Sequence, residues 1–397
     1  MKRLSEEQFV SLSCLFLFFD ALNGFFLTVV GLDIKISIAY KLFFLCFALV
    51  FLAKKNKNYF FFSLFLIIYS FIWSVFQNIF GSGDYLLNDF SEILKLFYTF
   101  IIFFTFSSFQ TSNPNVALIK ISFFSTIVLL FNVTVGYLGV GNTSYDDYGF
   151  KGLFYAGNAL SGVLVIIFSF YLFSNYSNGK YRFTSFFILM FIALMLGTKS
   201  AVLGLVLVFF LSYTKLSELK NFLFLMVILF LITFLVFSNF ELVTNSAVYT
   251  RISYFYDNGG ITRVLLSGRD VFLDNIFPIY LSTHVGGLIF GLGFEELREG
   301  GKPLVEMDFF DVLFIFGMST LLFYVISILT YAFILVKKNA FIDGVRVVFS
   351  ALLVLSLIAF WAGHILFNGL VTPFLGILLS IPFWKYNYLK WSECDNE

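Results

Sequence analysis

The stretch ISIAYKLFFLCFALVFLAKKNKNYFFFSLFLIIYSFIWSVFQNIF, residues 36–80, decides the architecture of this chain. It contains two apolar runs, 36–53 and 59–80. Each is close to the roughly 20 residues of helix that cross the hydrocarbon core of a bilayer. Three lysines, at positions 54, 55 and 57, lie in the short connection between the runs. Because basic connections stay on the cytoplasmic side of a membrane, the stretch predicts a helical hairpin with a cytoplasmic turn.

The rest of the chain repeats this pattern. Hydrophobic residues make up 60% of the 397 positions and charged residues 12%, and the mean hydropathy is +0.93. A soluble domain carries about 25% charged residues, so this composition excludes an ordinary soluble globule as well as a disordered chain. We predict an all-α fold, a polytopic integral membrane protein that forms a single membrane domain over 1–397. Its predicted spans, about twelve in number, are 9–31, 36–53, 59–80, 93–109, 116–138, 158–175, 183–198, 200–214, 221–238, 309–335, 346–368 and 371–385.

The charges predict the orientation of these segments. Basic residues fall on alternate connections, which assigns those connections and both termini to the cytoplasm. The opposite side carries acids such as Asp84, Asp89, Asp146 and Asp147. The first apolar run has no convincing cleavage site, so we interpret it as a retained span rather than a signal peptide. The basic markers are Lys2, Arg3, Lys54, Lys55, Lys57, Lys180, Arg182, Lys215, Lys220, Lys337, Lys338, Arg346, Lys385 and Lys390.

Several function classes find no support in the composition. The net charge of +1 gives no field that would recruit a nucleic acid. The three cysteines, Cys14, Cys46 and Cys394, suggest neither a disulfide framework nor a zinc site. No P-loop or dinucleotide fingerprint is present. We therefore predict no metal and no cofactor. The 61 phenylalanines are interpreted as lipid-facing apolar residues favoured by AT-rich coding.

One connection differs from the others. Residues 239–308 form a loop of roughly 70 residues on the non-cytoplasmic side, and loops of that length are usually functional or disordered. The loop contains the apolar runs 276–281 and 288–294, so we expect it to be ordered in part.

Basic residues at the outer ends of the segments are candidates for anion binding. Lys199 lies between two apolar segments, where a cation is either paired, functional or a snorkelling marker of a helix end. Arg269, in the large loop, could bind phosphate through its guanidinium fork or could simply be solvated. Arg251 and Arg263 lie near it and could share either role. Lys151, flanked by glycine, is equally consistent with a phosphate contact or a solvated lysine.

Acidic residues cluster where the large loop re-enters the membrane, in the sequence EMDFFD at 306–311. Asp308 and Asp311 are three residues apart and would share a helix face, with Glu306 just before it. A carboxylate held among like charges and apolar neighbours suits a general base, although Asp308 could instead cap the helix. His364 is either a hydrogen-bonded structural residue or a further proton acceptor.

These pieces, in this order, resemble the bacterial O-antigen polymerase and ligase superfamily, which comprises the Wzy-type polymerases and the WaaL-type ligases. The resemblance covers about residues 146–374 together with the helix topology. Four parts carry it: GFKGLF at 149–154 followed by GN at 157–158, GTKSA at 197–201, SGRD at 267–270 followed by IFGLGF at 289–294, and EMDFFDVLFIFG at 306–317.

The resemblance implies a glycosyltransferase of the bacterial inner membrane with a periplasmic active site. Its substrate would be an oligosaccharide repeat unit linked through diphosphate to undecaprenol, in the lipid bilayer, and a chain-length regulator protein is a candidate partner. Arg269 and Lys199 would then bind the leaving diphosphate, helped by Lys151 or Arg263. Glu306 and Asp308 would act on the acceptor hydroxyl, with His364 behind them.

Two other functions are alternatives. A ligase would transfer finished polymer to lipid A core, but ligases of the superfamily have a histidine where this chain has Glu306 and Asp308, which favours a polymerase. At the second motif Lys199 replaces the familiar arginine and loses its fork. A flippase would carry polar sites near the bilayer midplane in two related halves. Here the polar residues gather at one face, and only Asp20 and Asn23 are unexplained exceptions.

Overall fold

The computed structural model describes residues 6–80, 86–110, 114–143, 149–174, 179–213, 247–294, 297, 304–337, 343–361, 363 and 365–384. Nearly all of these residues are helical. The long elements are α1 (Glu6–Ser13), α2 (Phe16–Phe25), α3 (Ile36–Lys55), α4 (Lys57–Phe80), α5 (Leu86–Ser107), α6 (Pro114–Tyr137), α7 (Gly157–Ser174), α8 (Gly179–Leu196), α9 (Lys199–Tyr213), α12 (Ala247–Leu266), α13 (Arg269–Ser282), α14 (Val285–Phe290), α16 (Asp308–Lys337), α17 (Asp343–Trp361) and α18 (Thr372–Ser380). The short elements are η1 (Phe26–Val30), η2 (Ile381–Phe383) and an antiparallel hairpin of β1 (Asn142–Thr143) and β2 (Phe150–Gly152).

The described helices are those of a multi-pass membrane protein. Eight of them are long and apolar enough to cross a bilayer: Glu6–Val30, Ile36–Lys55, Lys57–Ile79, Leu86–Ser107, Pro114–Tyr137, Gly157–Ser174, Asp308–Lys337 and Gly344–Trp361. Three shorter apolar helices, Tyr181–Leu196, Lys199–Ser212 and Thr372–Phe383, lie where 183–198, 200–214 and 371–385 were predicted. The predicted segment 221–238 lies outside the described residues.

The helical hairpin of residues 36–80 is confirmed. Asn56 separates α3 from α4 because its backbone is extended, and its side chain accepts a hydrogen bond from the Tyr59 N–H at 3.2 Å. Lys54 and Lys55 occupy the last turn of α3, where positive charge complements the helix dipole. The two helices contact each other.

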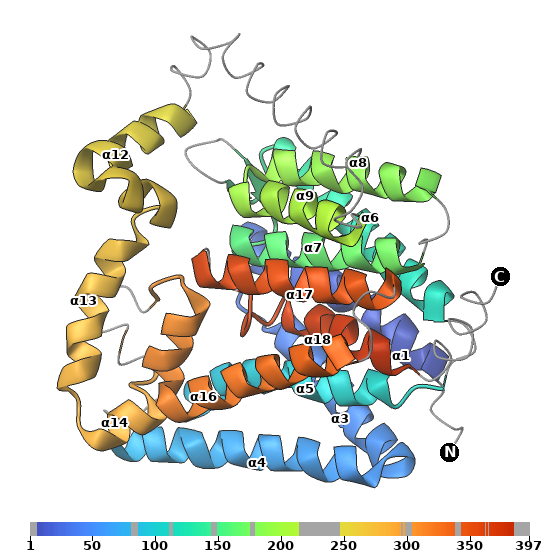
Figure 1. Cartoon of the computed structure of the whole chain (residues 1–397), viewed down its shortest axis with the longest axis horizontal. Coiled ribbons are helices and arrows are strands. Elements are labelled where there is room, and N and C mark those ends of the chain that lie inside the picture. The colour runs from blue at the N-terminus through green and yellow to red at the C-terminus, as the bar shows by residue number, and fades with distance from the viewer. Residues whose placement is uncertain are drawn as a thin grey trace.

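Helix α7 lies at the centre of the protein. It contacts α6, α8, α9, α17 and α18, and almost all its side chains from Ala159 to Phe173 are buried. A helix that is apolar on every side is stable only when other helices cover it all round. Figure 1 shows α7, α8, α9 and α17 running side by side, with α12 and α13 across one end of the bundle and α1 near the other.

Most of the described part of the loop at 239–308 is helical. It forms α12, α13 and α14, and α13 and α14 contact α16. The expectation of partial order is met for these helices, whereas 239–246, 295, 296 and 298–303 lie outside the described residues. Helix α12 is interrupted at Gly260, whose φ is +66°.

Helix α16 departs from the prediction of one continuous segment at 309–335. Gly317, with φ of +81°, breaks it within the first three turns. The break frees the carbonyls of residues 314–316, which a bilayer offers no water to satisfy. The N–H groups of 292 and 293 and the side chains of Gln77 and Trp73 donate hydrogen bonds to these carbonyls at 2.6 Å to 3.2 Å. The large loop is thereby joined to the membrane helices.

We predict that Gly317→Ala is strongly destabilising. A Cβ at Gly317 would lie 2.2 Å from the Ile289 carbonyl oxygen, in addition to the cost of a positive φ. Gly139 is a matched control, because its φ is also +81° and nothing lies within 4 Å of its Cβ position. Gly139→Ala should lose about 1 kcal/mol and Gly317→Ala more than about 3 kcal/mol. Thermal unfolding of the purified variants in detergent measures both, and equal losses would contradict the packing described for Gly317.

Candidate active site

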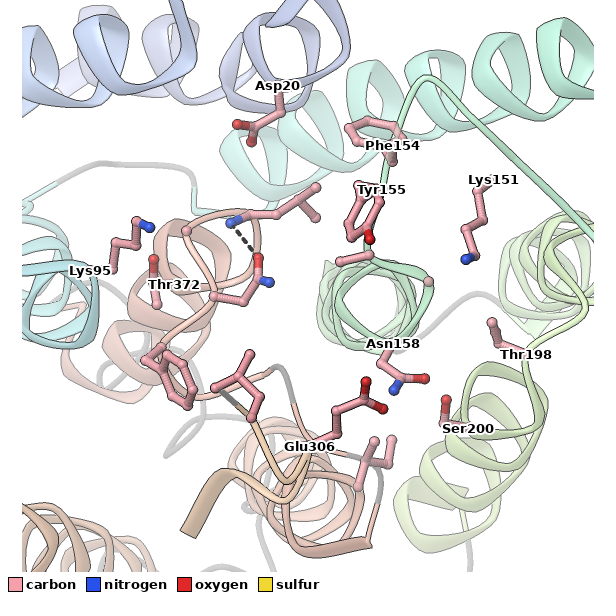
Figure 2. A pocket seen from close by; sticks show the side chains of 18 of the residues that line it. Asp20, Lys95, Lys151, Phe154, Tyr155, Asn158, Thr198, Ser200, Glu306 and Thr372 are labelled. Carbon is pink, nitrogen blue, oxygen red and sulfur yellow. Dashed lines mark hydrogen bonds between the residues drawn. The ribbon is translucent and has the colours of Figure 1, made fainter. Parts of the chain in front are cut away.

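The candidate site is a cavity of about 1880 Å³. Five predicted residues line it: Lys151, Lys199, Arg263, Arg269 and Glu306. Its walls also include apolar side chains of several helices, namely Leu42, Leu45, Leu203, Leu207, Val354 and Ile358. Figure 2 shows Lys151, Ser200 and Glu306 arranged around this space. The cavity thus combines charged groups with apolar walls, as a site for an amphiphile requires.

An ion pair joins two of the predicted residues. The Arg269 Nη2 lies 3.2 Å from the Glu306 Oε2, and the side chains are 12% and 28% exposed. Arg269 begins α13, and Glu306 lies just before α16. Partial burial strengthens the attraction between the two charges because fewer waters screen it. The pair therefore fixes the large loop to the point where the chain re-enters the helix bundle.

The backbone of Glu306 is held in an unusual conformation. Its φ of +65° lies in the left-handed region, which costs a non-glycine residue free energy. The buried Asp311 carboxylate accepts hydrogen bonds from the N–H groups on both sides, Val305 at 2.7 Å and Met307 at 3.1 Å. A Cβ at Gly363 would lie 2.3 Å from the Glu306 carbonyl oxygen, so only glycine fits there. Asp311 is thus a positioning residue for Glu306.

Asp308 is not part of the cavity lining. Its side chain is fully buried, and its Oδ2 accepts hydrogen bonds from the N–H groups of Ile365 and Leu366, both at 2.7 Å. The carboxylate therefore holds the segment after α17. This contact gives Asp308 a structural role, and its predicted catalytic role stays a prediction. His364 lies outside the described residues.

Lys151 projects from the β-hairpin, which Asn132 of α6 holds in place. The fully buried Asn132 side chain donates to the Lys151 carbonyl at 2.8 Å and accepts from the Leu153 N–H at 2.7 Å. Gly152, with φ of +58°, allows this close approach, since a Cβ there would lie 2.3 Å from the Asn132 carbonyl oxygen. Burial lowers the pKa of Lys151 below 10.5, and the negative charge of Glu306 opposes that shift.

Lys199 begins α9 next to a group of hydroxyls. The Ser161 Oγ of α7 lies 3.0 Å from both Thr198 Oγ1 and Ser200 Oγ. A Cβ at Gly157 would lie 3.3 Å from the Thr198 Cγ2, so the starts of α7 and α9 are packed closely. The first and second sequence motifs therefore meet at one wall of the cavity.

Arg263 lines the cavity with its charge partly balanced. Its Nε lies 2.9 Å from the Asp270 Oδ2, and its Nη1 donates to the Asn258 carbonyl at 2.8 Å. The side chain of Arg251 lies outside the part of the chain that the structure describes.

The sequence alone assigned no role to the supporting residues Asn132 and Gln77. Asn158 and Ser200 lie within the quoted motifs and line the cavity, but no role was predicted for them. Each of these residues is a single polar residue within or at the end of a predicted membrane segment. Placing such a residue in the membrane costs free energy unless it is paired, which could have marked it as having a partner. That signal gives no indication of the partner.

No family model and no curated protein matches the sequence of this chain. Any assignment of function therefore depends on the site itself.

The lowered pKa of Lys151 predicts how anion binding depends on pH. Only the protonated amine attracts an anion, so affinity for inorganic diphosphate should fall as pH rises through a pKa below 10.5. In Lys151→Arg this loss of affinity should be several-fold smaller, because arginine stays charged throughout this pH range. Isothermal calorimetry of both proteins between pH 7 and 10 measures the difference. Identical pH profiles would exclude Lys151 from the anion site.

Proposed function

We propose that this protein is a membrane glycosyltransferase that polymerises undecaprenyl-diphosphate-linked oligosaccharide repeat units at the periplasmic face of the bacterial inner membrane, as an O-antigen or capsule polymerase. The observation that carries the proposal is the cavity in which apolar walls meet Lys151, Lys199, Arg263, Arg269 and Glu306. The resemblance to the Wzy-type polymerases supports the same reaction.

The size and charge of the cavity favour a lipid-linked glycan. Sites for small molecules measure about 300–1,000 Å³, whereas this cavity measures about 1880 Å³. At this end of the cavity the described lining carries the four basic residues Lys151, Lys199, Arg263 and Arg269 and the single carboxylate of Glu306. Such a predominance of basic side chains suits a diphosphate. Arginine and lysine can bind a diphosphate directly, so the proposal is metal-independent.

The proposed reaction is a single displacement at the anomeric carbon of the donor sugar. The acceptor hydroxyl oxygen forms the new glycosidic bond, and the bond from the anomeric carbon to the diphosphate oxygen breaks. The hydroxyl proton passes to the Glu306 carboxylate, and undecaprenyl diphosphate leaves with the bonding electron pair. Fixed cations stabilise the charge that builds on the leaving group. Arg269 both contacts that group and orients Glu306 through their ion pair.

Removing the principal cation should abolish the polymer. Arg269→Ala should reduce long-chain polysaccharide at least about 100-fold, as loss of a group that stabilises transition-state charge does. Arg269→Lys keeps the charge without the fork and should restore part of the activity. Gel profiles of polysaccharide from a complemented deletion strain measure this, with immunoblots for protein level and Lys57→Ala as a control. Polysaccharide of normal chain length in Arg269→Ala would exclude Arg269 as the main diphosphate-binding residue.

The two acidic residues should behave differently. Glu306→Gln removes the proton acceptor and should abolish transfer while inorganic diphosphate still binds. Asp308→Asn keeps an oxygen that accepts the N–H groups of Ile365 and Leu366, so it should retain transfer with a lower melting temperature. The reverse result, activity in Glu306→Gln and none in folded Asp308→Asn, would exchange their roles.

Reconstitution tests the reaction class directly. Purified protein in lipid nanodiscs, supplied with a single lipid-linked repeat unit, should form chains of several repeats. Transport of the lipid-linked sugar without elongation would indicate a flippase. Accumulation of lipid-linked long chains after deletion of the gene would indicate a ligase, because a polymerase deletion leaves single repeats.

A further inference from the structure

A second polar cluster lines the same cavity, away from the predicted residues. It is built by α2, α3 and α5, which precede the first motif in the sequence and contribute no residue to the proposed reaction. We call it the Asp20 cluster, and it consists of Asp20 and Asn23 on α2, Ser37 and Lys41 on α3, and Glu92 and Lys95 on α5.

Asp20 has one satisfied and one unsatisfied oxygen. Its Oδ1 lies 2.5 Å from the Lys41 Nζ and accepts a second hydrogen bond from the Ser37 hydroxyl. Its Oδ2 is buried and has no hydrogen-bond partner among the described residues. The side chain is 9% exposed and lines the cavity. A buried acceptor without a hydrogen bond lowers the stability of the fold by about 1–3 kcal/mol. A bound ligand that donates a hydrogen bond to Oδ2 would remove this cost.

Asn23 presents a second acceptor of the same kind. It lies three residues after Asp20, on the same face of α2. Its Oδ1 is buried with no partner among the described residues, and its side chain also lines the cavity. Two unsatisfied oxygens side by side on one helix match the spaced hydroxyl donors of a sugar ring.

The charge of the cluster also favours a neutral ligand. Lys41 pairs with Asp20, and Lys95 pairs with Glu92 at 2.5 Å. The cluster is therefore electrically balanced, unlike the group of Lys151, Lys199, Arg263 and Arg269. A hydroxyl-rich ligand that both donates and accepts hydrogen bonds fits the balanced end, and an anion fits the positive end.

The two ends of the cavity are structurally joined. Gly24, one residue after Asn23, packs so closely on the hairpin segment that a Cβ there would lie 1.8 Å from the Leu153 carbonyl oxygen. The helix that carries Asp20 therefore rests against the segment that carries Lys151. Figure 2 shows Asp20 and Lys95 on one side of the space that Lys151 and Glu306 border on the other.

We propose that the Asp20 cluster is a saccharide-binding subsite, in which Asp20 Oδ2 and Asn23 Oδ1 accept hydrogen bonds from sugar hydroxyls and Lys95 donates to a sugar oxygen. The inference rests on the proposed function and extends it, because it assigns a glycan to this end of the cavity and the diphosphate to the other.

The test is binding of the free oligosaccharide that mild acid releases from the accumulated lipid-linked repeat, which carries neither lipid nor phosphate. Calorimetry on purified protein should show binding to the wild type, weakened about tenfold by Asp20→Asn and by Asn23→Ala, as expected for one lost hydrogen bond to a charged or buried group. Asp33→Asn, at an exposed residue outside the cavity lining, is the matched control and should bind as the wild type does. The Asn23 Oδ1 has no hydrogen-bond partner among the described residues, so Asn23→Ala should fold normally even if Asp20→Asn does not. It should also leave the binding of inorganic diphosphate unchanged.

Three results separate this inference from the proposed function. Equal saccharide affinity in wild type and Asn23→Ala overturns the subsite, even if the wild type elongates chains. Stabilisation of the wild type by Na⁺, with no saccharide binding, also overturns it and assigns the acceptors to a cation. Saccharide binding that depends on Asn23, in a protein that fails to elongate chains in nanodiscs, supports the subsite and contradicts the polymerase.

Discussion

The ion pair between Arg269 and Glu306 is the contact on which the candidate site depends. It links the first residue of α13 to the segment before α16, and so joins the large loop to the helix bundle at the rim of the cavity. The strained backbone of Glu306 persists because Asp311 holds the N–H groups on either side of it. A carboxylate placed at such a cost, opposite an arginine and beside Lys151, is typical of a functional site.

Polar side chains in this protein divide into two groups by what they contact. Those of Gln77, Asn132, Asp308 and Asp311 satisfy backbone groups of irregular segments, where the bilayer offers no water. Those that line the cavity, such as Arg269 and the Asp20 cluster, present charge or hydrogen-bonding atoms to its interior. The first group shapes the site, and the second group is the one from which ligand contacts are proposed.

Among the described residues the sequence predicted the apolar helices because length and hydropathy are local properties, as in the hairpin at 36–80. It also predicted that Lys151, Lys199, Arg263, Arg269 and Glu306 belong together, since all lie on one predicted side of the membrane, and all five line one cavity. It could not assign the direction in which a side chain points around its helix. Asp308 and Glu306 are two residues apart, yet one is buried against the backbone after α17 and the other faces the cavity. The break at Gly317 and the neighbours of Asp20 depend on contacts between distant segments, which no local pattern encodes.

We propose that Lys151, Lys199, Arg263, Arg269 and Glu306 form a diphosphate site at the edge of the apolar walls of the cavity. The most direct test is an electron cryomicroscopy structure of the protein with undecaprenyl diphosphate in a lipid nanodisc. The account predicts phosphate density between Arg269, Lys199 and Lys151, with the polyprenyl chain along the apolar wall that includes Leu203 and Val354. Phosphate density elsewhere on the protein, with this cavity occupied only by water, would contradict it.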